Sequence, residues 1–295
     1  MTHINNKSVM SRVFNLSRGM AMGEAKNKSR KRDEILKGEN RCIYCDNSPD
    51  SVEHMPPRSI FDNGGRPSGL EFASCSTCNY SSRASDAAAS FLARVSPEHK
   101  ASPEVMRRAS KILSTLSYIA PGFIREIFDP NKSEEVWAKG RSNIYGKMQK
   151  ITLDGPITTS LMQAFGAKLG MALFREHTGN PIPMEAKVFA QHYFNSGLYR
   201  GEVENILSIL PAFGQLTQGK KTSGRTFNYR YNTDKREILG AFCAFSDNLF
   251  FRIFAVCNPI YDDVLFESHD HKPIQPGTLP ILSESWRHAF ENKNF

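Results

Sequence analysis

The chain has 295 residues, 40% of them hydrophobic and 23% charged, so it can bury a substantial core. Its length lies between that of one large domain and that of two ordinary ones, and we expect two. No long apolar run is present, and the first twenty residues lack the apolar centre of a secretion signal, so we expect a cytoplasmic protein without membrane insertion. A net charge of +8 favours a polyanionic partner, above all nucleic acid.

Residues 1–40 are polar and basic, and we expect a helix or a mobile arm that contributes little to the core. Their basic run contains Lys28, Arg30, Lys31 and Arg32. These side chains form either a solvated helix face or a set of phosphate contacts, and the sequence leaves both readings open.

Residues 41–95 form a compact segment with the predicted order strand, loop, strand, helix. A short apolar stretch surrounds Val52, a loop rich in proline and glycine follows, and LEFAS (70–74) is the second extended stretch. A helix is predicted through 84–93.

Two C-x-x-C pairs bracket this segment, and they consist of Cys42, Cys45, Cys75 and Cys78. Each pair places two sulfurs on one side of a turn, as a closed tetrahedral zinc site requires. A redox pair or unliganded thiols are the alternatives. Because four thiolates would fill the coordination sphere, this zinc would be structural and would not activate water.

For residues 96–295 the sequence pattern predicts an α+β domain, and we expect this domain to serve targeting or regulation. Ser102-Pro103-Glu104 begins a helix, and a second helix is expected over 159–177, ended by Gly179. The stretches PMEAKVFAQHYFNSG (183–197) and GEVENILSIL (201–210) are predicted to continue this helical region. An antiparallel meander is then predicted from three aromatic and β-branched runs, FNYRYN, REILGAFCAF and LFFRIFAVCN. Cys243 and Cys257 are expected to be buried hydrophobic residues in these strands. The last thirty residues predict an irregular wrap with a short helix near Trp286.

Between the cysteine pairs lies Val52-Glu53-His54-Met55-Pro56-Pro57-Arg58-Ser59, and Asn79 follows the last cysteine. Together with the Gly-Gly loop, this pattern over about 41–93 resembles the HNH (His-Me finger) endonuclease superfamily. The resemblance implies an α+β protein in which an N-terminal ββα-metal module, supported by a four-cysteine zinc, precedes the larger domain.

The resemblance also implies how the chemistry is divided. His54 would be the general base that activates water, because an imidazole titrates in the right range. Glu53 and the amide oxygen of Asn79 would ligate a catalytic Mg²⁺ or another divalent cation, which prefers oxygen ligands and neutralises phosphate charge.

Each of these residues could instead have an ordinary structural role without any catalytic function. Glu53 and His54 would otherwise be a hydrogen-bonded pair, and Asn79 would cap the following helix. Arg58 and Arg83 are candidate phosphate contacts or solvated charges. Asp86 resembles an acid found in some HNH proteins and would support the metal ligands.

The sequence departs from the family pattern at three positions. Glu53 stands where aspartate is commoner, Asn79 replaces the final histidine, and the middle asparagine expected near Leu70 is missing. Since that asparagine orients the loop that carries the histidine, another group must do so in this chain.

The sequence therefore predicts a metal-dependent endonuclease that nicks DNA, with RNA as a second possible substrate. The layout resembles HNH effector nucleases of bacterial anti-phage defence, such as that of type II Zorya, which implies other defence components as partners. The alternative is a non-catalytic zinc module that binds nucleic acid or protein. Convergence of Glu53, His54 and Asn79 on one metal-sized cavity would favour the nuclease, whereas side chains that point apart would favour the binding module.

Overall fold

The computed structural model describes residues 26–61, 65–95, 102–139, 145–149, 151, 153–194, 216–267, 271–280 and 282. The helices are a first helix over 26–37, then η1 (Arg58–Ile60), α2 (Ser76–Ser81), α3 (Arg83–Leu92), α4 (Pro103–Ile119), α5 (Pro121–Ile127), α6 (Pro156–Thr178), η3 (Pro259–Tyr261) and α8 (Asp262–Glu267). The strands are β1 (Ser51–His54), β2 (Glu71–Ser74), β3 (Glu135–Lys139), β4 (Tyr145–Gln149), β5 (Lys187–Phe194), β6 (Thr217–Gln218), β7 (Phe227–Thr233), β8 (Ile238–Phe245) and β9 (Leu249–Val256). The fold is thus a mixture of helices and antiparallel sheets.

The four-cysteine segment contains the predicted order of elements. β1 pairs with β2 in an antiparallel register that places Glu53 opposite Phe72 and His54 opposite Glu71. α2 follows β2 after Cys75, and the carboxylate of Asp50 accepts hydrogen bonds from the backbone amide and the hydroxyl of Ser76 at the start of the helix. The predicted helix over 84–93 is α3.

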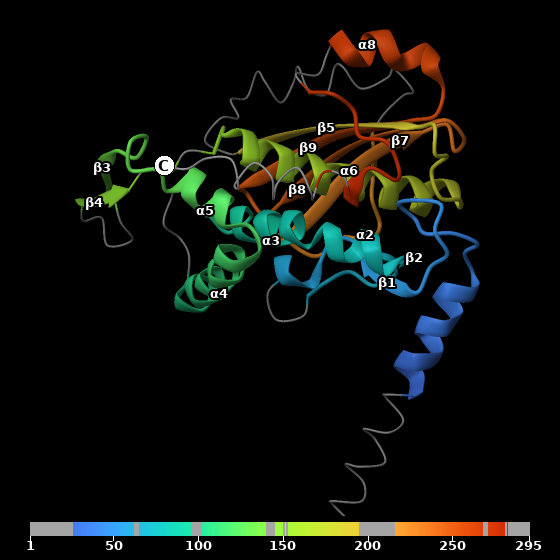
Figure 1. Ribbon diagram of the computed structural model, residues 1–295, viewed down its shortest axis with the longest axis horizontal. Helices are drawn as coiled ribbons and strands as arrows, with labels where there is room; N and C mark the ends of the chain where they lie inside the picture. Colours follow the sequence, from blue (N-terminus) through green and yellow to red (C-terminus); the bar gives the residue numbers. More distant parts are fainter. Residues whose placement is uncertain are drawn as a thin grey trace, which may run out of the picture.

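A five-stranded antiparallel sheet in the order β5-β9-β8-β7-β6 forms the largest layer, and its β7, β8 and β9 confirm the predicted meander. α6 lies between this sheet and α3 (Figure 1). Gly166 and Gly170 allow α6 to approach the sheet closely, since a Cβ atom at Gly170 would lie 2.7 Å from a methyl group of Ile253.

α6 is buried along most of its length, as expected for a helix enclosed on two sides. The sequence predicted the helix within a few residues and gave it a single apolar side. Gly155 precedes it, Pro156 is its first residue, and Gly179 ends it in the left-handed conformation with φ 86°.

The prediction of a helix over 183–197 is wrong in its described part, because residues 187–194 form β5. Val188 and Ala190 face α6, while β9 supplies the hydrogen bonds along one edge of β5. Met184, Glu185 and Ala186, whose helical propensity favours the wrong prediction, lie in the turn before the strand, and the valine, phenylalanine and tyrosine residues of β5 suit a sheet. The predicted segment 201–210 and the predicted helix near Trp286 lie outside the described residues, as do residues 1–25.

The structure has further elements that the sequence did not predict. α5 follows α4 after Ala120, and β3 and β4 form a separate two-stranded antiparallel sheet. Figure 1 shows this sheet at the left end of the molecule, beyond α5. Short polar strands with one or two aromatic residues carry little alternating pattern, which is why they were not predicted.

One continuous hydrophobic core joins the four-cysteine segment to the rest of the described chain. It contains Tyr44 and Leu92 from that segment, Phe165 from α6 and Phe251 from β9. None of the described helices combines the length and the apolar character needed to cross a membrane.

Candidate functional site

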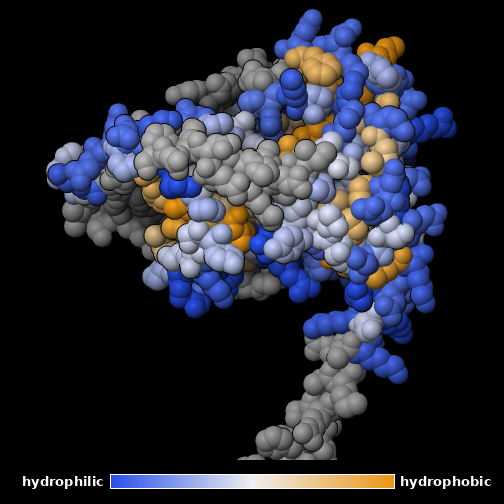
Figure 2. Space-filling model, in the orientation of Figure 1, coloured by the Kyte–Doolittle hydropathy of each residue, from blue (hydrophilic) through white to orange (hydrophobic). Residues whose placement is uncertain are grey.

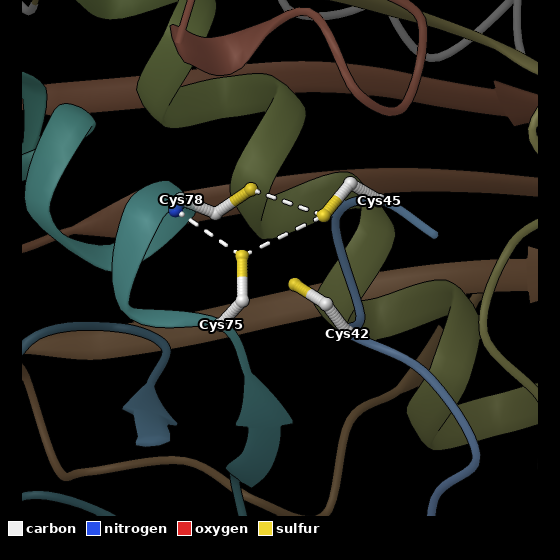
Figure 3. A group of neighbouring side chains, drawn as sticks. All are labelled: Cys42, Cys45, Cys75 and Cys78. Atoms are coloured by element: carbon white, nitrogen blue, oxygen red, sulfur yellow. Dashed lines mark hydrogen bonds between the residues drawn. The ribbon is translucent and has the colours of Figure 1, made fainter. Parts of the chain in front are cut away.

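The four sulfur atoms of Cys42, Cys45, Cys75 and Cys78 lie within 4.8 Å of one another, and all four side chains are buried. Figure 3 shows the side chains converging from the loop before β1 and from the start of α2. The Sγ atom of Cys45 is 3.6 Å from that of Cys75 and 3.5 Å from that of Cys78. A tetrahedral zinc with Zn–S bonds of about 2.3 Å separates its sulfurs by about 3.8 Å, so the cluster fits such an ion.

Backbone amides orient the sulfurs. The amide of Tyr44 donates to the Sγ atom of Cys42, and the amide of Cys78 donates to that of Cys75. Hydrogen bonding from the Cys78 thiol lowers the pKa of Cys42 to about 5, whereas burial raises the pKa of Cys45 to about 12. A metal ion bound by the four sulfurs would replace the protons of these thiols.

The remaining cysteines lie apart from this cluster. Cys243 is fully buried in β8, as predicted, whereas Cys257 is only half-buried.

Glu53 and His54 point to opposite faces of β1, because successive residues of a strand alternate. Glu53 is buried with 3% of its surface exposed, and its carboxylate accepts a hydrogen bond from the backbone amide of His54. His54 is half-buried on the other face, where its strand partner is Glu71.

Asn79 lies on the Glu53 side of β1. Its amide nitrogen is 3.5 Å from the hydroxyl of Ser51, which shares a strand face with Glu53. That contact is long for a hydrogen bond and does not use the amide oxygen. Asn79 is inside α2 and caps neither neighbouring helix, because the N-cap residues are Cys75 and Ser82. Capping is therefore not the role of Asn79.

The carboxylate of Glu53 faces a lysine that the sequence analysis did not single out. The ammonium nitrogen of Lys168 on α6 is 3.7 Å from Glu53 Oε2 and donates to both carboxylate oxygens of Asp86, at 2.8 and 2.7 Å. Lys168 is fully buried. A lysine in the middle of an apolar helical run was the available signal, because a buried lysine is almost always paired.

Burial has the largest effect on the pKa values of the two carboxylates. It raises the pKa of Glu53 to about 7 against the lowering effect of Lys168, and it raises the pKa of Asp86 as well. Burial alone would lower the pKa of Lys168, but Asp86 and Glu53 outweigh it and raise that pKa. Lys168 also lies over the ring of Tyr44, 5.6 Å from its centroid.

On the other face of β1, His54 lies among arginines. The Nη2 atom of Arg58 donates a hydrogen bond of 3.1 Å to Nε2 of His54, which requires that this ring nitrogen carry no proton. Burial, Arg66 and Arg58 together lower the pKa of His54. The imidazole is therefore held in its neutral form.

Arg66 closes the loop that follows His54. Its guanidinium donates to the backbone oxygens of Pro56, directly after the histidine turn, and of Leu70, directly before β2. Glu71 fixes the same guanidinium through an ion pair of 3.2 Å. Arg66 thus links both ends of the loop that the missing asparagine was expected to support.

The remaining predicted cations lie on α3 and on the first helix. Arg83 is exposed on α3 and lies 4.0 Å over the ring of Tyr80. Lys28, Arg30, Lys31 and Arg32 lie on the first helix, where hydrophilic side chains gather at the lower right of Figure 2. Arg30 pairs with Glu34, Lys31 pairs with Glu71, and Arg32 donates to the backbone oxygen of Asp50.

A pocket of about 420 Å³ lies between the first helix, β2 and the end of α6. Acidic and basic side chains line it together, among them Lys31, Glu71 and Arg175. Glu53, His54 and Asn79 do not line this pocket. Because Glu53 and His54 point to opposite faces of β1, the structure does not show the expected convergence of the three side chains on one cavity.

Comparisons with protein-family models, with curated proteins and with solved structures find no match to this chain.

Proposed function

We propose that the protein is a metal-dependent endonuclease of the HNH type that cuts one DNA strand. The observation that carries the proposal is the arrangement around β1. Glu53 and Asn79 lie on the side that faces α2, and a neutral His54 follows Glu53 at the end of the strand. The four-cysteine cluster lies at the start of the same helix.

His54 acts as the general base in this proposal. Because its Nε2 atom is unprotonated, it can accept a proton from water without first losing one. Arg58, which now donates to that nitrogen, is exposed and carries a guanidinium that matches phosphate oxygens. A bound phosphate would attract Arg58 and free the nitrogen for water.

Glu53 and the amide oxygen of Asn79 would hold the divalent cation, for which Mg²⁺ is the proposed ion. Among the described residues, Glu53 Oε2 has no hydrogen-bond partner although it is buried, so a carboxylate oxygen is left for a hard cation. The ion would neutralise charge on the scissile phosphate. The role of the cysteine zinc is structural, since its four thiolates leave no open position.

The charge of the chain supports a nucleic-acid substrate, and Arg58, Arg83 and the cations of the first helix are the proposed phosphate contacts. RNA is attacked at the same kind of phosphate and is the alternative polymer. A role in anti-phage defence with other components belongs to the same proposal and rests on the resemblance alone.

A second function, a zinc module that binds without cutting, has one observation in its favour. The carboxylate of Glu53 is enclosed with Lys168, and the side chain of His54 projects from the opposite face of β1. In such a module the charges around β1 would serve only folding and binding.

A matched pair of histidine variants separates the two functions. His54→Ala is expected to lower Mg²⁺-dependent plasmid nicking by at least about a hundredfold, as the loss of a general base does. His177→Ala, which changes a half-buried histidine on α6, is the control and should retain nicking wherever zinc content and folding are retained. Equal nicking by both variants would remove His54 from the mechanism.

A further inference from the structure

Three charged side chains meet where α3, α6 and β1 come together. Lys168 contributes the positive charge, and Asp86 and Glu53 contribute two carboxylates. With all three ionised, the net charge of the group is negative. Because the group is buried, water does not screen this charge, and its attraction for a cation is stronger than at the surface.

Lys168 forms hydrogen bonds with only one of the two carboxylates. Asp86 receives two hydrogen bonds from the ammonium, while Glu53 Oε2 lies at 3.7 Å, beyond hydrogen-bond distance. Within the described part of the chain, neither Glu53 Oε2 nor the buried hydroxyl of Tyr44 has a hydrogen-bond partner. The orphaned carboxylate oxygen of Glu53 is an acceptor that a hard cation can use.

The position of Lys168 is fixed by the fold. α6 is the central helix between the five-stranded sheet and α3. Gly166 and Gly170 let it pack closely on that sheet because they have no side chain. A fully buried ammonium cannot move to water without rearranging this helix. Lys168 is therefore a permanent part of the group, supplied by a segment about a hundred residues distant in the chain from the cysteine motifs.

We propose that Glu53 and Asp86 form one cation site in which Lys168 is a resident cation, and that this lysine sets how tightly the site binds a divalent metal. The inference rests on the proposed function for the identity of the metal ligand Glu53. It adds Asp86 and Lys168 as the residues that tune that ligand.

The consequence is competition between two cations for one carboxylate. Asp86 holds the ammonium on its own side and so leaves Glu53 Oε2 open. At a pH at which both carboxylates are ionised in every variant, removing the lysine charge strengthens metal binding, whereas removing the Asp86 charge weakens it, because the ammonium then turns to Glu53. The site is thereby tuned to load at higher metal concentrations than a site without the lysine.

The test is a charge series in the zinc-loaded full chain, with Mn²⁺ as the probe and free Mn²⁺ measured by electron paramagnetic resonance. Lys168→Met is expected to bind Mn²⁺ at least about tenfold more tightly than wild type, and Asp86→Asn at least about tenfold more weakly. The double variant restores the net charge and should lie near wild type. Lys187→Met removes a lysine paired with Asp262 elsewhere in the fold and should leave the affinity unchanged.

Zinc content and thermal unfolding check that each variant is folded. Should Lys168→Met not fold, the double variant and Asp86→Asn carry the same test, because the double variant must then bind Mn²⁺ more tightly than Asp86→Asn. Affinities that do not follow the charge series overturn the inference.

The outcomes also separate this inference from the proposed function. If Glu53→Gln weakens Mn²⁺ binding but the charge series is flat, Glu53 remains the metal ligand and the role of Lys168 is wrong. If the series holds and the protein does not nick DNA, the cation site stands and the nuclease proposal fails.

Discussion

At the scale of single residues, a site made by local spacing can be predicted from the sequence, whereas a contact between distant residues cannot. The four-cysteine cluster was predictable because each C-x-x-C pair defines its own turn, and the structure brings the two pairs together as a group that could hold a metal ion. The partnership of Lys168 with Glu53 and Asp86 was not, because nothing local in the run FGAKLG tells which distant acids approach it. Arg66 is a similar case, since its role depends on where Pro56 and Leu70 meet.

A residue-scale prediction follows for the cysteines. Cys45→Ser is expected to lose bound zinc and to lower the unfolding temperature, because a structural zinc contributes directly to folding. Cys257→Ser is the matched control, since this half-buried cysteine lies outside the cluster, and should retain zinc. Zinc is measured by a colorimetric chelator after denaturation. Retention of a full equivalent of zinc by Cys45→Ser would contradict the four-cysteine assignment.

At the scale of elements, the predictions held where the pattern and the tertiary contacts agreed. β7, β8 and β9 have aromatic and β-branched residues with clear turns between them, so their own sequence defines them. β5 was missed because the run Met184-Glu185-Ala186 before it favours a helix, although the valine, phenylalanine and tyrosine residues of the strand itself suit a sheet. Pairing partners far along the chain are not visible in a local pattern.

The packing of α6 on the sheet gives a prediction at this scale. Gly170→Ala would place a Cβ atom 2.7 Å from Ile253 and 2.8 Å from Val188, so it is expected to destabilise the protein by about 1–3 kcal/mol. Gly146→Ala in β4 meets no atom within 4 Å and is the control. Urea unfolding measures both. A Gly170→Ala variant as stable as wild type would show that α6 does not approach the sheet this closely.

At the scale of the whole molecule, the cysteine segment and the rest of the described chain behave as one packed unit. The amide of Gly277 donates to the backbone oxygen of Tyr44, and Asn248 donates to that of Ala93. Lys168 adds an ion pair across the same boundary. The sequence suggested separate regions because composition changes along the chain, whereas a shared core appears only when distant segments fold together.

The buried histidines give the molecule a predictable response to acid. Burial lowers the pKa of His192 from 6.5 to about 4, so the folded protein keeps this ring neutral while the unfolded chain binds a proton. The stabilising contribution is present above pH 6.5 and is lost as the pH falls toward 4, with a total of about 3 kcal/mol.

His192→Gln removes this titration. The free energy of unfolding of the variant, measured by urea titration at pH 7 and pH 5, is therefore expected to fall less on acidification than that of wild type. Parallel losses in the two proteins would show that His192 is not a source of acid sensitivity.

The most direct test of the nuclease proposal uses the wild-type protein. Zinc-loaded protein is incubated with supercoiled plasmid in Mg²⁺ and, in parallel, with Mg²⁺ omitted and EDTA added at a concentration that leaves the zinc content unchanged. The proposal predicts that nicked circles accumulate only with Mg²⁺ and precede any linear product. Plasmid that is retarded by the protein in a gel yet remains uncut in Mg²⁺ would contradict the proposal and identify a binding module.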